Sequence, residues 1–68
     1  MAGTYYNSLN LEEAIKNLEG TKFKVVEGKD SFKETVFEIT MNGEPIFKTY
    51  STSNLQAYSL GLKEGLKH

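Results

Sequence analysis

Few side chains in this sequence could carry chemistry. The only histidine is His68, at the last position, where chain ends are usually poorly ordered and where a purification-tag remnant would also lie. There is no cysteine, which removes thiolate catalysis, disulfides within the chain and cysteine zinc sites. Asp30, Glu34 and Glu38 could gather a divalent cation, but without EF-hand spacing a solvated acidic face is the simpler interpretation. We therefore expect no catalytic residue, no bound metal and no cofactor.

The charges are nearly balanced. Eight basic and nine acidic side chains give a formal net charge of −1, so no strong overall field attracts a polyanion. Every basic side chain is lysine, and without arginine the chain lacks the bidentate fork that phosphate and guanine recognition favours. This composition counts against sequence-specific nucleic-acid recognition more than against weak binding to a phosphate backbone.

Length and patterning predict one small domain. With 68 residues, the chain is near the lower limit for a single core without disulfides or metal. We expect one domain over residues 1–68, with an N-terminal arm over 1–9 and a folded core over 10–67. The apolar runs are too short for a membrane span, and the N-terminus lacks the pattern of a signal peptide, so a cytoplasmic location is expected.

A first helix is predicted between Asn10 and Gly20. Asn10 can cap it, Glu13 stands at the third helical position as in a capping box, and glycine commonly terminates helices. Leu9 and Ala14 have the spacing of a hydrophobic staple. Apolar residues at helical spacing predict one stripe that faces the core, made of Leu11, Ala14, Ile15 and Leu18.

Alternation predicts a first strand over Lys22–Val26. Phe23 and Val25 share one face of this strand, and lysines occupy the other. Residues 28–31 are turn formers and predict a loop. Phe32 follows, and because aromatic side chains tend to be buried, we expect it to be tucked under the sheet.

A β-hairpin is predicted around the Asn42-Gly43 pair. A two-residue loop would set Phe47 opposite Glu38, whereas a three-residue loop that includes the preceding methionine would set it opposite Phe37. We favour the second register, because it pairs two aromatic side chains. Its inner face contains Phe37, Ile39, Phe47 and Thr49, and its outer face contains Glu34, Val36, Glu38, Ile46, Lys48 and Tyr50.

The C-terminal segment predicts a second helix, capped by Thr52 or Ser53. Its apolar stripe consists of Leu55, Tyr58, Leu62 and Leu66. Beside the stripe Ala57, Gly61 and Gly65 recur every four residues, although a glycine inside a helix costs about 1 kcal/mol relative to alanine. Close packing against another backbone is the first explanation for these small residues. A flat surface for a partner or a second copy, and fraying of the helix end, are the alternatives.

Together these elements predict an α+β fold in the order α-β-β-β-α, with both helices on one face of a three-stranded antiparallel sheet. At this level the chain resembles the double-stranded-RNA-binding domain. The string FEITMNG (Phe37–Gly43) is similar to that family's second strand and turn, and Ser53 and Ala57 fall on the Ser and Ala of its SKKxAK helix start. The resemblance extends over residues 10–67 and implies the same fold.

The chain departs from that family where the family binds RNA. Family members contact phosphates through lysines at the start of the last helix, where this chain has Asn54, Leu55 and Tyr58. Of the Gly-Pro-x-His element that reaches the minor groove, only Gly28 is kept. The remaining candidate contacts to a nucleic-acid backbone are Lys16, Lys29, Lys33 and Ser53.

The sequence therefore favours a small non-enzymatic module that binds another macromolecule, most simply a protein, as an interaction, inhibitor or accessory domain. The candidate protein interface combines the outer sheet face with the small-residue flank of the last helix, and consists of Val36, Ile46, Tyr50, Ala57, Tyr58, Gly61 and Gly65. Self-association is included, since a chain this small gains stability by sharing a core. A weak binder of the double-stranded RNA or DNA backbone, and a small phage or mobile-element protein, are the alternatives.

Overall fold

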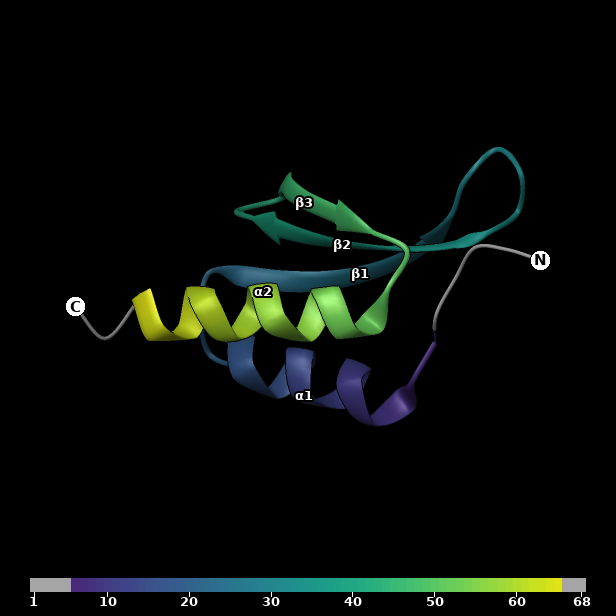
Figure 1. The fold of residues 1–68 in the computed structure, drawn as a ribbon. Coiled ribbons are helices and arrows are strands. Elements are labelled where there is room, and N and C mark those ends of the chain that lie inside the picture. The colour runs from purple at the N-terminus through teal and green to yellow at the C-terminus, as the bar shows by residue number, and fades with distance from the viewer. Residues whose placement is uncertain (1–5, 66–68) are drawn as a thin grey trace.

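The computed structural model describes residues 6–65 and places two helices against one face of a three-stranded antiparallel sheet (Figure 1). The elements are α1 (Ser8–Leu18), β1 (Phe23–Lys29), β2 (Thr35–Met41), β3 (Glu44–Thr49) and α2 (Thr52–Gly65). The strands lie in the order β1-β2-β3, so β1 and β3 are the edge strands. The predicted α+β class and the order α-β-β-β-α are confirmed. The predicted places of Leu66 and His68 lie outside the described residues.

Helix α1 begins earlier than predicted, because Asn7 rather than Asn10 caps it. The side-chain oxygen of Asn7 accepts hydrogen bonds from the main-chain N–H groups of Leu9 at 2.9 Å and Asn10 at 3.3 Å. Either asparagine can cap a helix, but the earlier one adds a turn, and Glu13 is then no longer at the capping-box position. The helix ends as predicted, just before Gly20, whose φ of +77° favours glycine.

The pairing of β2 with β3 differs from the predicted register. Residues 42–43 form a two-residue turn, with φ values of +53° and +90°. A bulge next to Ile39 then shifts the pairing by one residue, so Phe47 pairs with Ile39 and the predicted pairing with Phe37 is wrong. Because one extra residue restores the alternation, the bulge returns Phe47 to the face that carries Phe37 and Ile39.

Helix α2 is capped by Ser51, which precedes both predicted caps, Thr52 and Ser53. The Ser51 hydroxyl accepts a hydrogen bond from the main-chain N–H of Asn54 at 3.3 Å. Thr52 is buried, and its hydroxyl accepts a hydrogen bond from the main-chain N–H of Asn7 at 2.9 Å. This bond ties the starts of the two helices together, a role that the sequence does not reveal.

The core lies between the sheet and the helices, which pack side by side (Figure 1). Its buried members are Ala14, Leu18, Phe23, Phe37, Ile39 and Leu55. Helix α2 is rotated relative to its predicted stripe, because Ser59 is buried and its hydroxyl accepts a 3.2 Å hydrogen bond from Asn17 of α1. Tyr58 lies instead at the edge, where its ring stacks on Phe47 with the centroids 4.0 Å apart.

Candidate functional site

The β1–β2 loop, residues 30–34, is held in place by its own hydrogen bonds. One carboxylate oxygen of Asp30 accepts hydrogen bonds from the main-chain N–H groups of Phe32 at 2.8 Å and Glu34 at 3.0 Å. The Asp30 N–H donates to the Glu34 carbonyl oxygen, and the Lys33 N–H donates to the Asp30 carbonyl oxygen, both at 3.0 Å. Asp30 therefore joins the two ends of the loop, as aspartate does in many turns.

Tyr50, just after β3, supports the same aspartate. Its hydroxyl donates a 2.7 Å hydrogen bond to the second carboxylate oxygen of Asp30. Because Phe37 pairs with Thr49, the next position along the two strands sets Tyr50 opposite Val36, and the hydroxyl of the Tyr50 ring reaches the loop that precedes β2. Val36 was expected to be exposed on that face but is only 6% exposed, which we attribute to cover by this ring. Val36 is therefore not available to a partner.

The hydrogen bond between Tyr50 and Asp30 affects the acidity of both groups. Together with the weaker effect of the Glu34 N–H, the Tyr50 hydroxyl favours the carboxylate and lowers the pKa of Asp30. The same bond favours the protonated phenol and raises the pKa of Tyr50. At neutral pH, Asp30 is thus an ionised acceptor and Tyr50 a protonated donor, which is the combination that this bond requires.

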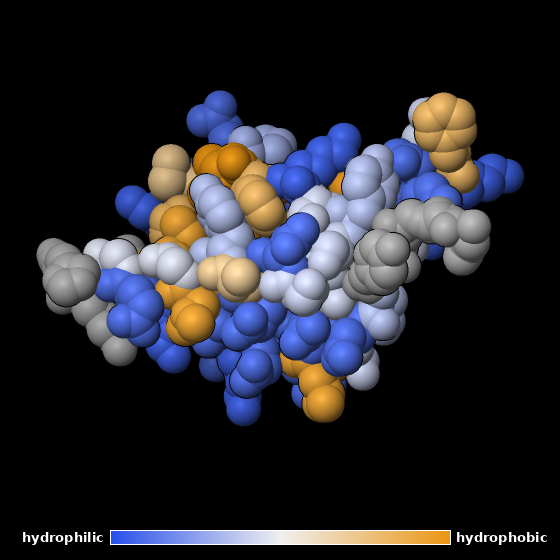
Figure 2. All heavy atoms as spheres, viewed as in Figure 1, coloured by the Kyte–Doolittle hydropathy of each residue, from blue (hydrophilic) through white to orange (hydrophobic). Residues whose placement is uncertain are grey.

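Phe32 projects from the loop and is 84% exposed, so the expectation that it is tucked under the sheet is wrong. The physical reason is the hydrogen bond from its N–H to Asp30, which holds the main chain at the tip of the loop. The next residue, Lys33, has φ +64°, a conformation that costs a non-glycine residue about 1–2 kcal/mol. In Figure 2 an apolar group projects from among hydrophilic neighbours at the end of the molecule that carries this loop. A large apolar side chain is therefore displayed to solvent from a defined backbone.

Other residues of the predicted protein interface are exposed elsewhere. Ile46 is exposed on the edge strand β3, and Tyr50 is exposed despite its hydrogen bond to the loop. Ala57, Gly61 and Gly65 are exposed on α2. These residues stay candidates for contact with a partner, but neither large side chain among them is as exposed as that of Phe32. The sequence shows that Phe32 is an aromatic residue near a predicted loop. The orientation of its side chain follows only from the hydrogen bonds around it, which the structure reveals.

The glycines of α2 do not mark close packing. Apart from its two chain neighbours and the nearby backbone of α2 itself, a Cβ atom added at Gly61 or Gly65 would meet no atom within 4 Å. The explanation that these residues allow another part of the chain to approach closely is therefore wrong. By contrast, Gly20 and Gly43 have positive φ and are required by the backbone.

The candidate nucleic-acid contacts lie at different places. Lys29 is the last residue of β1 and Lys33 lies in the β1–β2 loop, and the Lys29 ammonium donates a 2.6 Å hydrogen bond to the Thr35 hydroxyl. Ser53 is in the first turn of α2, at the same end of the molecule as this loop (Figure 1). Lys16 is in the last turn of α1, towards the other end. The structure brings three of these four residues to one end.

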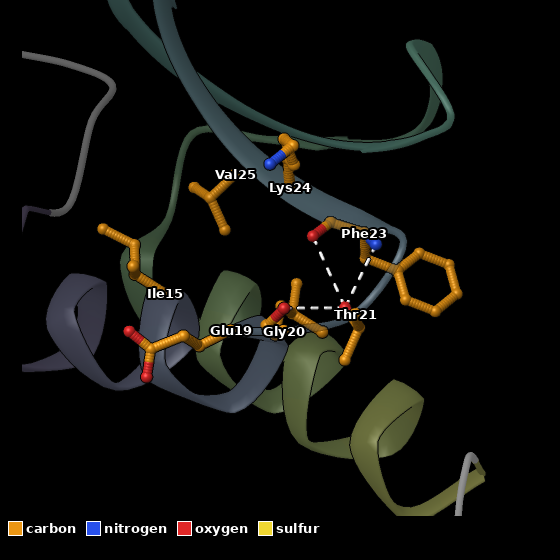
Figure 3. Close-up of a pocket in the computed structure, with 8 residues that line it drawn as sticks. Ile15, Glu19, Gly20, Thr21, Phe23, Lys24 and Val25 are labelled. Atoms are coloured by element: carbon orange, nitrogen blue, oxygen red, sulfur yellow. Dashed lines mark hydrogen bonds between the residues drawn. The ribbon is translucent and has the colours of Figure 1, made fainter.

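A cleft of about 300 Å³ lies between the C-terminal end of α1 and the start of β1 (Figure 3). Its apolar lining is Ile15, Leu18, Phe23 and Val25, and Glu19 and Lys24 add charges. Thr21 fixes the connecting turn, because its hydroxyl donates to the Leu18 carbonyl oxygen at 2.7 Å and accepts from the Phe23 N–H at 3.1 Å. Ile15 was predicted in the core stripe but is about half exposed here. No pattern in the sequence predicts this cleft, since it depends on how α1 meets β1.

Within residues 6–65 no group of three or more His, Cys, Asp or Glu side chains could hold a metal ion. Neither helix in that part of the chain is long and apolar enough to cross a membrane. Comparisons with protein-family models, with curated proteins and with solved structures find no match. The function must therefore be inferred from the geometry of the molecule.

Proposed function

We propose that this chain is a non-enzymatic module that binds another protein through the aromatic loop, by which we mean residues 30–34. The observation that carries the proposal is the 84% exposure of Phe32 on a loop with a fixed backbone. Full burial of a phenylalanine side chain is worth about 1.5–3 kcal/mol, so contact with a partner would gain free energy that the free chain forgoes. Large aromatic side chains are also frequent anchors of protein interfaces.

The hydrogen bonds around Asp30 suit the loop to this role. A loop that must become ordered on binding loses affinity, whereas a loop already held in one conformation avoids part of that cost. Asp30 accepts from two main-chain N–H groups and from the Tyr50 hydroxyl, so its position depends on both β1 and the end of β3. Lys29 and Lys33 provide a polar surrounding for Phe32, as is common at interfaces.

The chemistry of the available side chains supports binding rather than catalysis. The chain has no cysteine, and its single histidine is the last residue. Asp30 is the carboxylate with the most distinctive surroundings, but its lowered pKa makes it a weak base at neutral pH. Three of its about four lone-pair sites already accept hydrogen bonds within the chain. We therefore assign Asp30 a structural role in the aromatic loop.

Binding to the backbone of double-stranded RNA is the second candidate. The element order is that of the RNA-binding family that the sequence resembles, and Lys29 and Lys33 lie on the loop that reaches the minor groove in that family. Helix α2 counts against this function. Leu55 is buried in the core and Tyr58 stacks on Phe47, so two positions where the family has lysines serve packing in this chain.

A photo-crosslinking amino acid at position 32 tests the proposal. Benzoylphenylalanine replaces Phe32 in the full chain, in cells of its source organism, and the matched control carries it in place of Leu60, which is 41% exposed on α2. We expect light-dependent crosslinks to protein from position 32 and few from position 60. The substitution Asp30→Ala should reduce the crosslinks from position 32, because the loop loses its fixed conformation. Identical crosslinks from both positions, or crosslinks to RNA alone, would overturn the proposal.

A further inference from the structure

We propose that the protein bound by the aromatic loop is a second copy of this chain. In this dimer the free edges of β1 pair antiparallel, and Phe32 of each copy enters the cleft between α1 and β1 of the other. The inference rests on the proposed function, since it names the partner of the same loop.

The outer edge of β1 can accept another strand. Along an antiparallel ladder, residue pairs that are hydrogen-bonded alternate with pairs that are not. The Asp30 N–H donates to the Glu34 carbonyl and the Asn42 N–H donates to the Lys22 carbonyl, so both of these pairs belong to the hydrogen-bonded set. Even-numbered residues of β1 therefore bond to β2, and the main-chain groups of the odd-numbered residues, such as Glu27, point away from the sheet. Within residues 6–65 no strand pairs with this edge. Such an edge is a template for pairing with another chain.

The aromatic loop and the cleft lie at opposite ends of β1, which is what an antiparallel dimer needs. A two-fold axis brings unlike ends together and makes each contact twice. With Val26 on the axis, Val25 and Glu27 of opposite copies become a hydrogen-bonded pair, as their outward main-chain groups require. The same register sets Lys29, the last residue of β1 before the aromatic loop, opposite Phe23 of the other copy, and Phe23 lines the cleft. The exposed ring thus comes to a cleft next to β1 that has an apolar lining.

The side chains of β1 are compatible with this register. Lys22 of one copy faces Asp30 of the other, so opposite charges meet at both ends of the paired strands. On the axis the two Val26 side chains, each 46% exposed in the single chain, cover one another. A parallel arrangement would instead set each lysine beside the same lysine of the other chain, so that like charges meet.

The cleft fits a phenylalanine side chain in size and chemistry. Its volume of about 300 Å³ is at the lower end for ligand pockets and has room for one benzyl group. Ile15 and Val25 line it, as Figure 3 shows, and Ile15 is about half exposed without a partner. Entry of Phe32 would remove two apolar surfaces from water at once.

Sedimentation equilibrium of the full chain tests the inference at concentrations from about 1 µM to 1 mM, the range in which small interfaces associate. We expect a reversible dimer. Val26→Lys sets two like charges against each other and should weaken the dimer by about tenfold or more. The matched control is Ile46→Lys, at a position that is 38% exposed on the other edge strand, and it should change the dissociation constant by less than about twofold. Phe32→Ala should weaken the dimer as Val26→Lys does.

Glu27→Pro provides a second variant in case Val26→Lys does not fold. Its missing N–H points away from β2, so the ladder within the chain is kept while two hydrogen bonds of the dimer are lost. A chain that is monomeric up to about 1 mM overturns the inference, as do equal effects of Val26→Lys and Ile46→Lys. If the chain is monomeric but position 32 still crosslinks to a different protein, the inference fails and the proposed function stands. If both tests are negative, both fail.

Discussion

The two loops that connect the strands of this sheet differ in a way that sheet formation alone does not explain. The β2–β3 turn needs only Asn42 and Gly43, and it carries no apolar side chain. The β1–β2 loop uses residues 30–34, is held by hydrogen bonds to Asp30, and displays Phe32. Two residues are enough to join antiparallel strands. The longer loop is thus the one that displays an aromatic side chain to solvent.

The two loops also differ in which residues have positive φ angles. In the β2–β3 turn these angles fall on asparagine and glycine, which tolerate them best. In the β1–β2 loop the positive φ falls on Lys33, next to Phe32. A strained lysine persists only where its surroundings impose the conformation, and such residues are concentrated at functional sites.

The largest effect on stability is expected in the short turn. Gly43→Val forces a β-branched residue to a φ of +90° and should lower the free energy of unfolding by about 1–3 kcal/mol. Gly28→Val is the matched control, because Gly28 lies in β1 with free space around its Cβ position, and it should leave stability unchanged or raise it. Urea unfolding followed by circular dichroism measures both variants. Equal losses at the two glycines would contradict our description of the turn.

A substitution at Gly61 in α2, where the backbone does not require glycine, should raise stability instead of lowering it. Gly61→Ala meets no atom within 4 Å and should raise the free energy of unfolding by about 1 kcal/mol, because alanine is the better helix former. The same urea experiment measures it, and a loss of stability would show that Gly61 is packed after all. Together the two experiments distinguish a glycine that a turn requires, Gly43, from a helix glycine that the backbone does not require, Gly61.

The pH dependence of the aromatic loop is the third test. Because the folded-state pKa of Asp30 is lowered, its stabilisation of the loop is fully present above its ordinary value of about 3.9 and is lost as the pH falls through the lower folded-state value. Tyr50→Phe removes the largest cause of that shift, so the transition should move to higher pH. The amide NMR signals of Phe32 and Glu34 report the transition. An unchanged midpoint in the variant would disprove the bond between Tyr50 and Asp30.

Phe32→Ser should have the smallest effect on the free energy of unfolding and the largest effect on binding. Phe32→Ser removes an exposed ring and should change the free energy of unfolding by less than about 0.5 kcal/mol. The same variant should lose association with the partner, as measured by sedimentation. A large loss of stability would mean that Phe32 supports the fold and is not an interface residue.

The sequence predicts which helices and strands form better than it predicts how they pair and where they are capped. Alternation and helical spacing identify all five elements, because each pattern is local. The bulge beside Ile39 escapes prediction, since it depends on how β2 and β3 meet across the sheet. The cap at Asn7 is missed because two asparagines three residues apart offer the same chemistry, and only the bond from Asn7 to Thr52 distinguishes them.

The candidate site is less predictable for the same reason. The main chain at Phe32 is held by a hydrogen bond to Asp30, and Asp30 also accepts a hydrogen bond from Tyr50, which is twenty residues further along the chain. Burial tendencies predict the opposite orientation for Phe32, and strand alternation predicts an exposed Val36, which is only 6% exposed. Long-range contacts, not composition, define this surface.

Intermolecular NMR contacts test the central claim most directly. A sample that mixes labelled and unlabelled full chains, at a concentration where the dimer forms, reports only contacts between copies. We predict nuclear Overhauser effects from the Phe32 ring of one copy to the methyl groups of Ile15 and Val25 of the other, and their loss in Val26→Lys. An associated chain with no such contacts, or with contacts from Phe32 to Ile46 instead, would contradict the account.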